Sequence, residues 1–187
     1  MIPPAPRPPR PLRPLLSAVL ATLGLLSLLA GCTPAPAPTP TPTAAFASEE
    51  EAFAAAEETY RTYNDAFNAL VLDDPATFEA LYDLSSGDFE AADRKNLSEL
   101  RANNLALAGS MKLAYFEGIE SEFPFERVRA LVCIDVSEVD VVDASGHSVT
   151  EDNRPGMNPL LVTFVQSEGE LRIDRADRDE EAACTSE

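Results

Sequence analysis

Residues 127–142 read RVRALVCIDVSEVDVV, and this stretch decides the fold. Its first part alternates apolar residues with others, which predicts a β-strand with one buried face. That face comprises Val128, Ala130, Val132, Ile134 and Val136. The apolar positions then move to Val139 and Val141, an odd shift in the period of two. The shift indicates a β-bulge near Ser137 and Glu138, which bends the strand and redirects its side chains.

The segments around this strand alternate in the same way. The preceding segment predicts a strand whose apolar face comprises Met111, Leu113 and Tyr115. Residues 143–147 (DASGH) predict a hairpin turn after it. Residues 160–165 and 171–173 predict a second hairpin, closed by residues 167–170. The C-terminal half of the chain is therefore a predicted antiparallel sheet.

The N-terminal half has a helical pattern instead. Ser48 and Glu51 have the spacing of a capping box, so a helix should start here. Apolar residues then recur at spacings of three and four, which is the buried face of a helix. They are Phe53, Ala56, Tyr60, Tyr63, Phe67 and Leu70. This is the clearest helix signal in the chain.

Two shorter helices are predicted after it. Asp74 is a candidate N-cap, and Pro75 suits the first helical position that follows. Residues 85–87 (SSG) end this helix, and a third runs from Asp88 to about Asn103. The side chains expected to be buried are Phe78, Leu81 and Tyr82 in the second helix and Phe89, Leu97 and Leu100 in the third.

Three helices followed by a bent antiparallel sheet define an α+β domain with the helices packed on one face of the sheet. The order of elements from residue 48 to about residue 176 resembles the SnoaL-like, or nuclear transport factor 2-like, cone fold. The resemblance rests on the long first helix, the short helix that starts at Asp-Pro, and the bent stretch at 128–142. A different α+β meander is the alternative architecture.

The resemblance implies a pocket between the concave sheet and its helices. Enzymes with this fold, such as polyketide cyclases and steroid isomerases, place aspartate, histidine or tyrosine in it. The candidate pocket-lining residues of this chain are Tyr60, Tyr63, Phe67 and Tyr115. The alternative for the tyrosines is an ordinary core position with the hydroxyl near the rim.

Candidates for catalysis are few, and no catalytic residue is assigned. His147 is the single histidine and lies in a predicted turn, where an exposed position is expected. Asp65 follows Tyr63 by two residues and Tyr60 by five, so it should point away from both. The acidic clusters lack the alternating ligands and glycine of a calcium loop, and no phosphate-binding glycine loop is present. No metal or cofactor is predicted, and an enzymatic role is left open.

The N-terminus has the features of a secretion signal. Three arginines lie in the first 14 residues, and residues 15–30 are apolar but shorter than the roughly 20 residues of a membrane-spanning helix. Residues 29–32 (LAGC) resemble the lipobox of bacterial lipoproteins. This resemblance implies cleavage after Gly31 and attachment of lipid to the sulfur of Cys32. The alternative is a chance cysteine after an ordinary signal or in a membrane helix.

The predicted organisation is a signal peptide at 1–31, a lipidated cysteine and Pro/Thr/Ala-rich linker at 32–47, and an extracytoplasmic α+β domain at 48–187. The alternating prolines of the linker predict an extended tether about 30–40 Å long. In this organisation the chain resembles lipoproteins of actinobacteria that carry such a cone behind a proline-rich tether.

The charge of the chain limits its partners. Without residues 1–31, the chain keeps 11 basic and 32 acidic residues, and its net charge is −21. A surface this acidic repels nucleic acid and anionic lipid headgroups. We therefore expect attachment to the membrane through the lipid on Cys32 and no nucleic-acid partner.

Two cysteines remain once Cys32 carries lipid. Cys133 lies in the apolar run 131–134, and Cys184 lies in a polar tail. An even pair in an oxidising compartment predicts a disulfide between them. An inert buried thiol at Cys133 is the alternative.

These observations favour a non-catalytic, membrane-anchored extracytoplasmic lipoprotein. Its domain would bind a small apolar ligand or a partner protein in the cell envelope. The alternatives are a SnoaL-like enzyme acting on a hydrophobic small molecule and a purely structural interaction module. A deep cavity with converging titratable groups would favour the enzyme, and a filled interior would favour the interaction module.

Overall fold

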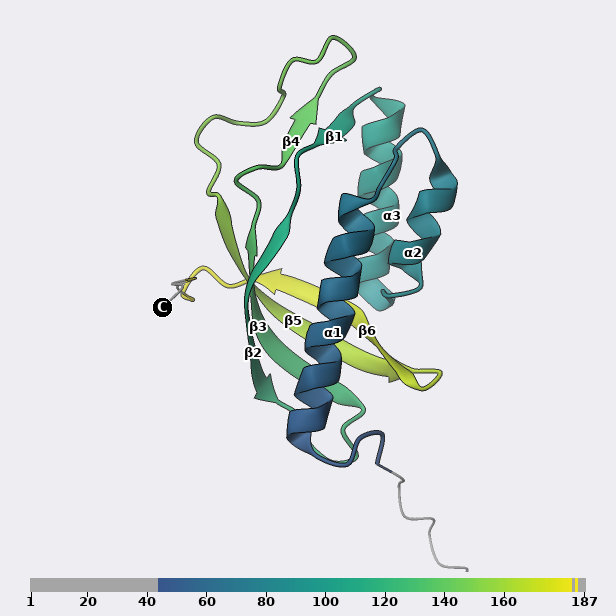
Figure 1. Cartoon of the computed structure of the whole chain (residues 1–187), viewed down its shortest axis with the longest axis vertical. Helices are drawn as coiled ribbons and strands as arrows, with labels where there is room; N and C mark the ends of the chain where they lie inside the picture. The colour runs from purple at the N-terminus through teal and green to yellow at the C-terminus, as the bar shows by residue number, and fades with distance from the viewer. Residues whose placement is uncertain (1–43, 183, 185–187) are drawn as a thin grey trace, which may run out of the picture. The chain divides into compact units, whose positions relative to one another are not determined.

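A computed structural model describes residues 44–182 and residue 184 (Figure 1). The predicted signal peptide, the cleavage position at Gly31 and the lipidation site at Cys32 lie outside the described residues. The elements in chain order are α1 (Glu49–Asn68), the 3₁₀ turn η1 (Pro75–Phe78), α2 (Glu79–Tyr82), α3 (Gly87–Ala102), β1 (Ala106–Ala108), β2 (Lys112–Glu120), β3 (Arg127–Asp135), β4 (Asp140–Val142), β5 (Met157–Ser167) and β6 (Glu170–Arg178). Among the residues described, no helix is both long and apolar enough to cross a membrane.

Helix α1 begins where the capping box predicts. The Ser48 hydroxyl accepts the backbone N–H of Glu51 at 3.2 Å. The Glu51 carboxylate accepts the N–H of Ala47 at 2.9 Å, one residue further back than in the standard box. The helix is amphipathic, and its buried side chains are Ala52, Ala56, Tyr60, Tyr63 and Asn64.

The two shorter helices also form where the sequence predicts them. The Asp74 carboxylate accepts the N–H of Ala76 at 3.1 Å, with Pro75 between them, and this starts η1 and then α2. Helix α3 spans Gly87–Ala102 and buries Leu97, while Phe89 and Leu100 are half-buried and pack against the core.

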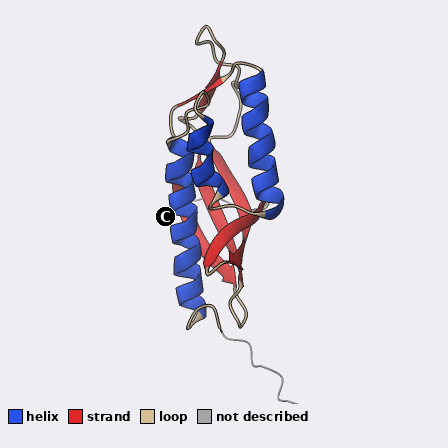
Figure 2. Ribbon diagram, turned by 90° about the vertical axis from the view of Figure 1, so that its right-hand side faces the viewer, coloured by secondary structure: helices blue, strands red, loops and turns tan. Residues whose placement is uncertain are grey.

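Strands β2, β3, β5 and β6 form one antiparallel sheet in the order β2-β3-β5-β6, and β1 pairs with β4. Helix α1 contacts β2, β3 and β6, and α3 contacts β6 (Figures 1 and 2). A Cβ atom on Gly118 of β2 would lie 2.3 Å from the Phe53 ring of α1. The glycine therefore allows the helix to approach the sheet closely. The predicted α+β architecture, with three helices on a bent antiparallel sheet, is confirmed.

The prediction of a β-bulge at Ser137 and Glu138 is wrong, because a turn between two strands lies there instead. Strand β3 ends at Asp135, and a tight turn follows in which the N–H of Val139 donates to the carbonyl of Val136 at 3.1 Å. The chain then pairs with a different strand, because β3 pairs with β2 and β5 whereas β4 pairs with β1. The change of phase that motivated the bulge is real: Val136 is buried, and Val139 packs against the same core.

Strand β2 contains irregularities that the sequence pattern did not predict. Its register with β3 shifts between Leu113, opposite Ile134, and Tyr115, opposite Cys133. Leu113 packs against the core, whereas Tyr115 is 42% exposed on the other face of the sheet. The prediction that Met111, Leu113 and Tyr115 share one face is therefore wrong for Tyr115 because of the extra residue between them.

The interior between helices and sheet is filled with side chains. The residues with no exposed surface include Ala52, Ala56, Val128, Ala130, Val132, Val162, Phe164 and Ile173. Tyr60 and Leu81 are each 1% exposed and are among the largest fully buried side chains. The concave face of the sheet is thus packed against the helices as a hydrophobic core.

The predicted disulfide partners meet on the opposite face of the sheet. Cys133 and Cys184 are bonded at a sulfur–sulfur distance of 2.11 Å, with their Cα atoms 5.7 Å apart. Strand β6 continues to Arg178, and the N–H of Asp179 donates to the carbonyl of Pro159 at 3.0 Å. The segment that follows Ile173 is therefore held on the sheet up to this point, as predicted.

Candidate functional site

The structure separates the four predicted pocket-lining residues. Tyr60 and Tyr63 are 1% and 4% exposed, and Phe67 is partly buried against the same core. Tyr115 lies on the outer face of the sheet, where its hydroxyl donates to Glu117 at 3.0 Å. Tyr115 is therefore separated from the other three residues, which pack in the core, and none of the four lines any of the cavities described below.

A carboxylate that was not among the predicted site residues joins the buried tyrosines. The Tyr63 hydroxyl donates to Oδ2 of Asp93 on α3 at 2.9 Å. Burial raises the pKa of Asp93 to about 6, although the hydrogen bond from Tyr63 acts in the opposite direction. Burial and the charge of Asp93 raise the pKa of Tyr63 well above its ordinary value. The carboxyl group of Asp93 is therefore partly desolvated, and it remains protonated at higher pH than the carboxyl group of an exposed aspartate.

A sequence signal for Asp93 did exist. Phe89, Asp93 and Leu97 are spaced four residues apart, which places the carboxylate in the apolar stripe of α3. Phe89 also packs edge-on against Tyr63, with the ring centroids 5.2 Å apart. Asp65, the acid that lies close to both tyrosines in sequence, is exposed, as the helix spacing indicated.

His147 lies in the hairpin turn, as predicted. Its side chain is 82% exposed, and its backbone N–H donates to the Asp143 carboxylate at 3.0 Å. The Ser145 hydroxyl lies 3.2 Å from Nδ1 of its ring. These contacts stabilise a surface turn and assemble no catalytic pair.

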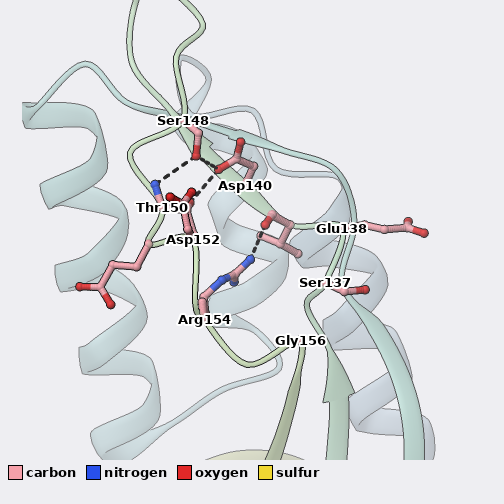
Figure 3. A pocket seen from close by; sticks show the side chains of 10 residues that line it. Ser137, Glu138, Asp140, Ser148, Thr150, Asp152, Arg154 and Gly156 are labelled. Atoms are coloured by element: carbon pink, nitrogen blue, oxygen red, sulfur yellow. Dashed lines mark hydrogen bonds between the residues drawn. The ribbon is translucent and has the colours of Figure 1, made fainter.

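A polar cavity lies beside β4 (Figure 3). Its volume is about 550 Å³, and its lining includes Ser137, Asp140, Ser148, Thr150 and Arg154. The Asp140 carboxylate accepts hydrogen bonds from the hydroxyls of Ser148 and Thr150, both at 2.7 Å. Arg154 donates to the carbonyls of Val136 and Val139.

These contacts in the polar cavity have a structural explanation. The hydroxyls of Thr150 and Ser148 hold the pKa of Asp140 below its usual value. Arg154 satisfies carbonyls of the turn between β3 and β4. Arg154 therefore ties the loop after β4 to this turn, and the Asp140 carboxylate binds Ser148 and Thr150 of that loop (Figure 3).

An apolar groove lies between α1 and the turn that joins β5 to β6, and we call it the α1–β6 groove. Its volume is about 400 Å³. Its lining residues are Phe46, Ala55, Glu58, Thr59, Thr62, Leu84, Gly169, Glu170 and Leu171. The Thr59 hydroxyl lies 2.9 Å from the carbonyl of Ala55 and 3.3 Å from the carbonyl of Leu171 on β6, so it has hydrogen-bond partners within the helix and across the groove. The groove therefore offers mainly apolar contacts with a few acidic groups.

Two smaller cavities of about 180 and 340 Å³ lie beside Phe89 on α3 and beside Asn64 on α1. None of these four cavities is lined by Tyr60, Tyr63 or Asp93. Within residues 44–182 and 184, no group of three or more His, Cys, Asp or Glu side chains is arranged to hold a metal ion.

Solved structures provide similarities of fold. A protein of Novosphingobium aromaticivorans, provisionally assigned as an aromatic ring hydroxylase, aligns with a TM-score of 0.51 and 14% identity, over 73% of this chain and 93% of that one. The intermembrane-space region of the chloroplast protein ARC6 aligns with a TM-score of 0.50 and 12% identity, over 67% and 95%. The likeness shows the fold. No protein-family profile and no curated protein matches the chain.

Proposed function

We propose that this protein is a lipoprotein anchored through Cys32 on the extracytoplasmic face of a membrane. We further propose that its cone domain binds a small apolar ligand or a partner protein without catalysis. The signal-like N-terminus, the sequence LAGC at 29–32 and the proline-rich tether support the anchor. The Cys133–Cys184 disulfide is consistent with an oxidising compartment.

The filled interior is the observation that favours a non-catalytic domain over an enzyme, and by itself it fits an interaction module. Tyr60 and Phe164 occupy the space between helices and sheet, where enzymes of this fold would hold a substrate. The α1–β6 groove remains open on the surface, and its volume of about 400 Å³ is in the range of small-ligand sites. Its apolar lining suits a hydrophobic molecule of modest size.

A neutral fluorescent probe tests this proposal. N-phenyl-1-naphthylamine avoids the repulsion that an anionic dye would meet on this acidic surface. Thr62→Trp places an indole at the groove and should weaken probe binding at least about tenfold. Ala54→Trp, at an exposed position of α1 outside the groove lining, is the matched control and should bind like the wild type. Equal binding by both variants would remove the groove from this account.

The Tyr63–Asp93 pair is the observation that favours the alternative, an enzyme acting on a hydrophobic molecule. A partly desolvated carboxyl group with a raised pKa is typical of acid–base sites, and one solved structure of similar fold is assigned as a hydroxylase. Catalysis requires that substrate reach Asp93. Carbodiimide coupling of the folded protein, followed by peptide mapping, measures this access, with exposed Asp65 as the internal standard. Labelling of Asp93 as fast as Asp65 would favour the enzyme.

A further inference from the structure

The loop between β2 and β3, residues 121–126 (SEFPFE), presents an aromatic side chain to solvent. Phe123 is 57% exposed, the largest fraction among the exposed large hydrophobic side chains of the residues described. Phe125 lies beside it, with the ring centroids 6.0 Å apart in an edge-on arrangement. Aromatic side chains such as Phe are enriched at protein interfaces relative to the rest of the surface.

The loop is held in one conformation by its own hydrogen bonds. The N–H of Phe125 donates to the carbonyl of Glu122 at 2.7 Å. The Ser121 hydroxyl donates to the carbonyl of Arg127 at 3.1 Å, and its N–H donates to the Glu49 carboxylate at 3.2 Å. Phe125 also has a φ of 64°, in the left-handed region that residues other than glycine rarely adopt. A preorganised loop loses little conformational entropy when it binds.

Two acidic side chains flank the aromatic pair. Glu122 and Glu126 flank it in sequence and are exposed. Glu120 lies at the end of β2, paired with Arg129 at 2.8 Å. Arg129 neutralises Glu120, and exposed Arg127 directly follows Glu126, so the loop itself presents two exposed carboxylates beside an apolar centre. Such a surface complements an apolar pocket edged by lysine or arginine, and it is repelled by anionic lipid headgroups.

The loop lies next to the segment that follows the predicted tether. The N–H of Ala45 donates to the carbonyl of Pro124 at 2.8 Å, so the chain that comes from the linker passes directly beside the loop. We propose that residues 121–126 form a docking surface that inserts Phe123 into a basic-rimmed apolar pocket of an envelope protein. This inference rests on the proposed extracytoplasmic location, and it concerns a surface distinct from the α1–β6 groove.

Site-specific photo-crosslinking in the full-length protein tests the proposal. p-Benzoylphenylalanine replaces Phe123 in the native host, and the same group at Val149, which is 52% exposed in another loop, is the control. The expected result is a protein adduct specific to position 123, on a peptide that combines apolar residues with Lys or Arg. Adding Glu122→Lys and Glu126→Lys should lower its yield at least about tenfold. The proposal would be overturned by adducts to lipid alone, by the absence of an adduct, or by an adduct yield that is the same with and without Glu122→Lys and Glu126→Lys.

The crosslinked protein, once purified, gives an equilibrium test. Phe123→Ala should weaken its binding about 30-fold or more, as expected for an interface hot spot, whereas Val149→Ala should change it less than threefold. Phe123 is exposed, so its removal should leave the fold intact. Phe123-dependent binding to phosphatidylglycerol vesicles would overturn the proposal in favour of a lipid surface. Binding of N-phenyl-1-naphthylamine in the groove does not involve Phe123, so the two proposals fail separately.

Discussion

Removing the Cys133–Cys184 disulfide should lower the free energy of unfolding by about 4 kcal/mol. The two cysteines are 51 residues apart in sequence. On the chain-entropy model, cross-linking a loop of this length removes about 14 cal/mol/K from the unfolded chain, or about 4 kcal/mol at 25 °C. Cys133 is fully buried, so the thiol left by Cys184→Ser stays in an apolar environment and adds little further cost.

Urea unfolding of the oxidised protein, the reduced protein and Cys184→Ser measures this effect. Tyrosine fluorescence can follow the transition because the chain contains no tryptophan. The oxidised protein should be the most stable, and the reduced protein and Cys184→Ser should agree with each other. A difference below about 1 kcal/mol, or free thiols at both positions in non-reducing peptide maps of the exported protein, would refute the reasoning.

Three further predictions concern a buried carboxylate, the anchor and a helix–sheet contact. Because burial raises the pKa of Asp93 to about 6, the folded state holds its proton more tightly than the unfolded chain. The stability that the raised pKa of Asp93 contributes should thus fall by about 2 kcal/mol between pH 4 and pH 6, and Asp93→Asn should remove this contribution, which is measured as the difference between denaturant titrations of the wild type and the variant. Cys32→Ser should leave the protein unprocessed or released to the medium, and a fatty-acid label that still marks this variant would contradict lipidation at Cys32. Gly118→Ala should cost about 1–3 kcal/mol because its Cβ would meet the Phe53 ring, and Phe53→Leu in the same chain should recover part of the loss.

Local signals in the sequence predicted the helices and the hairpins. The side chains of Ser48 and Asp74 cap the starts of α1 and η1, and each cap depends on only a few neighbouring residues. The turns at 143–147 and 167–170 were equally local. Because short-range chemistry determines these features, it can be read without knowing the fold.

The errors arose where distant segments decide the outcome. A phase change at Ser137 is compatible with a bulge or with a turn, and the choice depends on β4 pairing with β1 rather than with a neighbour of β3. The position of Tyr115 depends on a register shift against β3. The burial of Asp93 could be predicted from its place in the apolar stripe of α3, but its pairing with Tyr63 could not, because Tyr63 is 30 residues away on another helix. None of these contacts has a signature within one short window of sequence.

Native mass spectrometry of the protein extracted from its own host membrane tests the central claim most directly. If the domain works by binding, the wild type and Ala54→Trp should carry the same apolar molecule or protein partner in defined stoichiometry. Thr62→Trp should lose a small molecule bound in the α1–β6 groove, and Phe123→Ala should lose a partner protein held by the loop at 121–126. A wild-type protein that is free of both ligand and partner under conditions that preserve its fold would contradict the account.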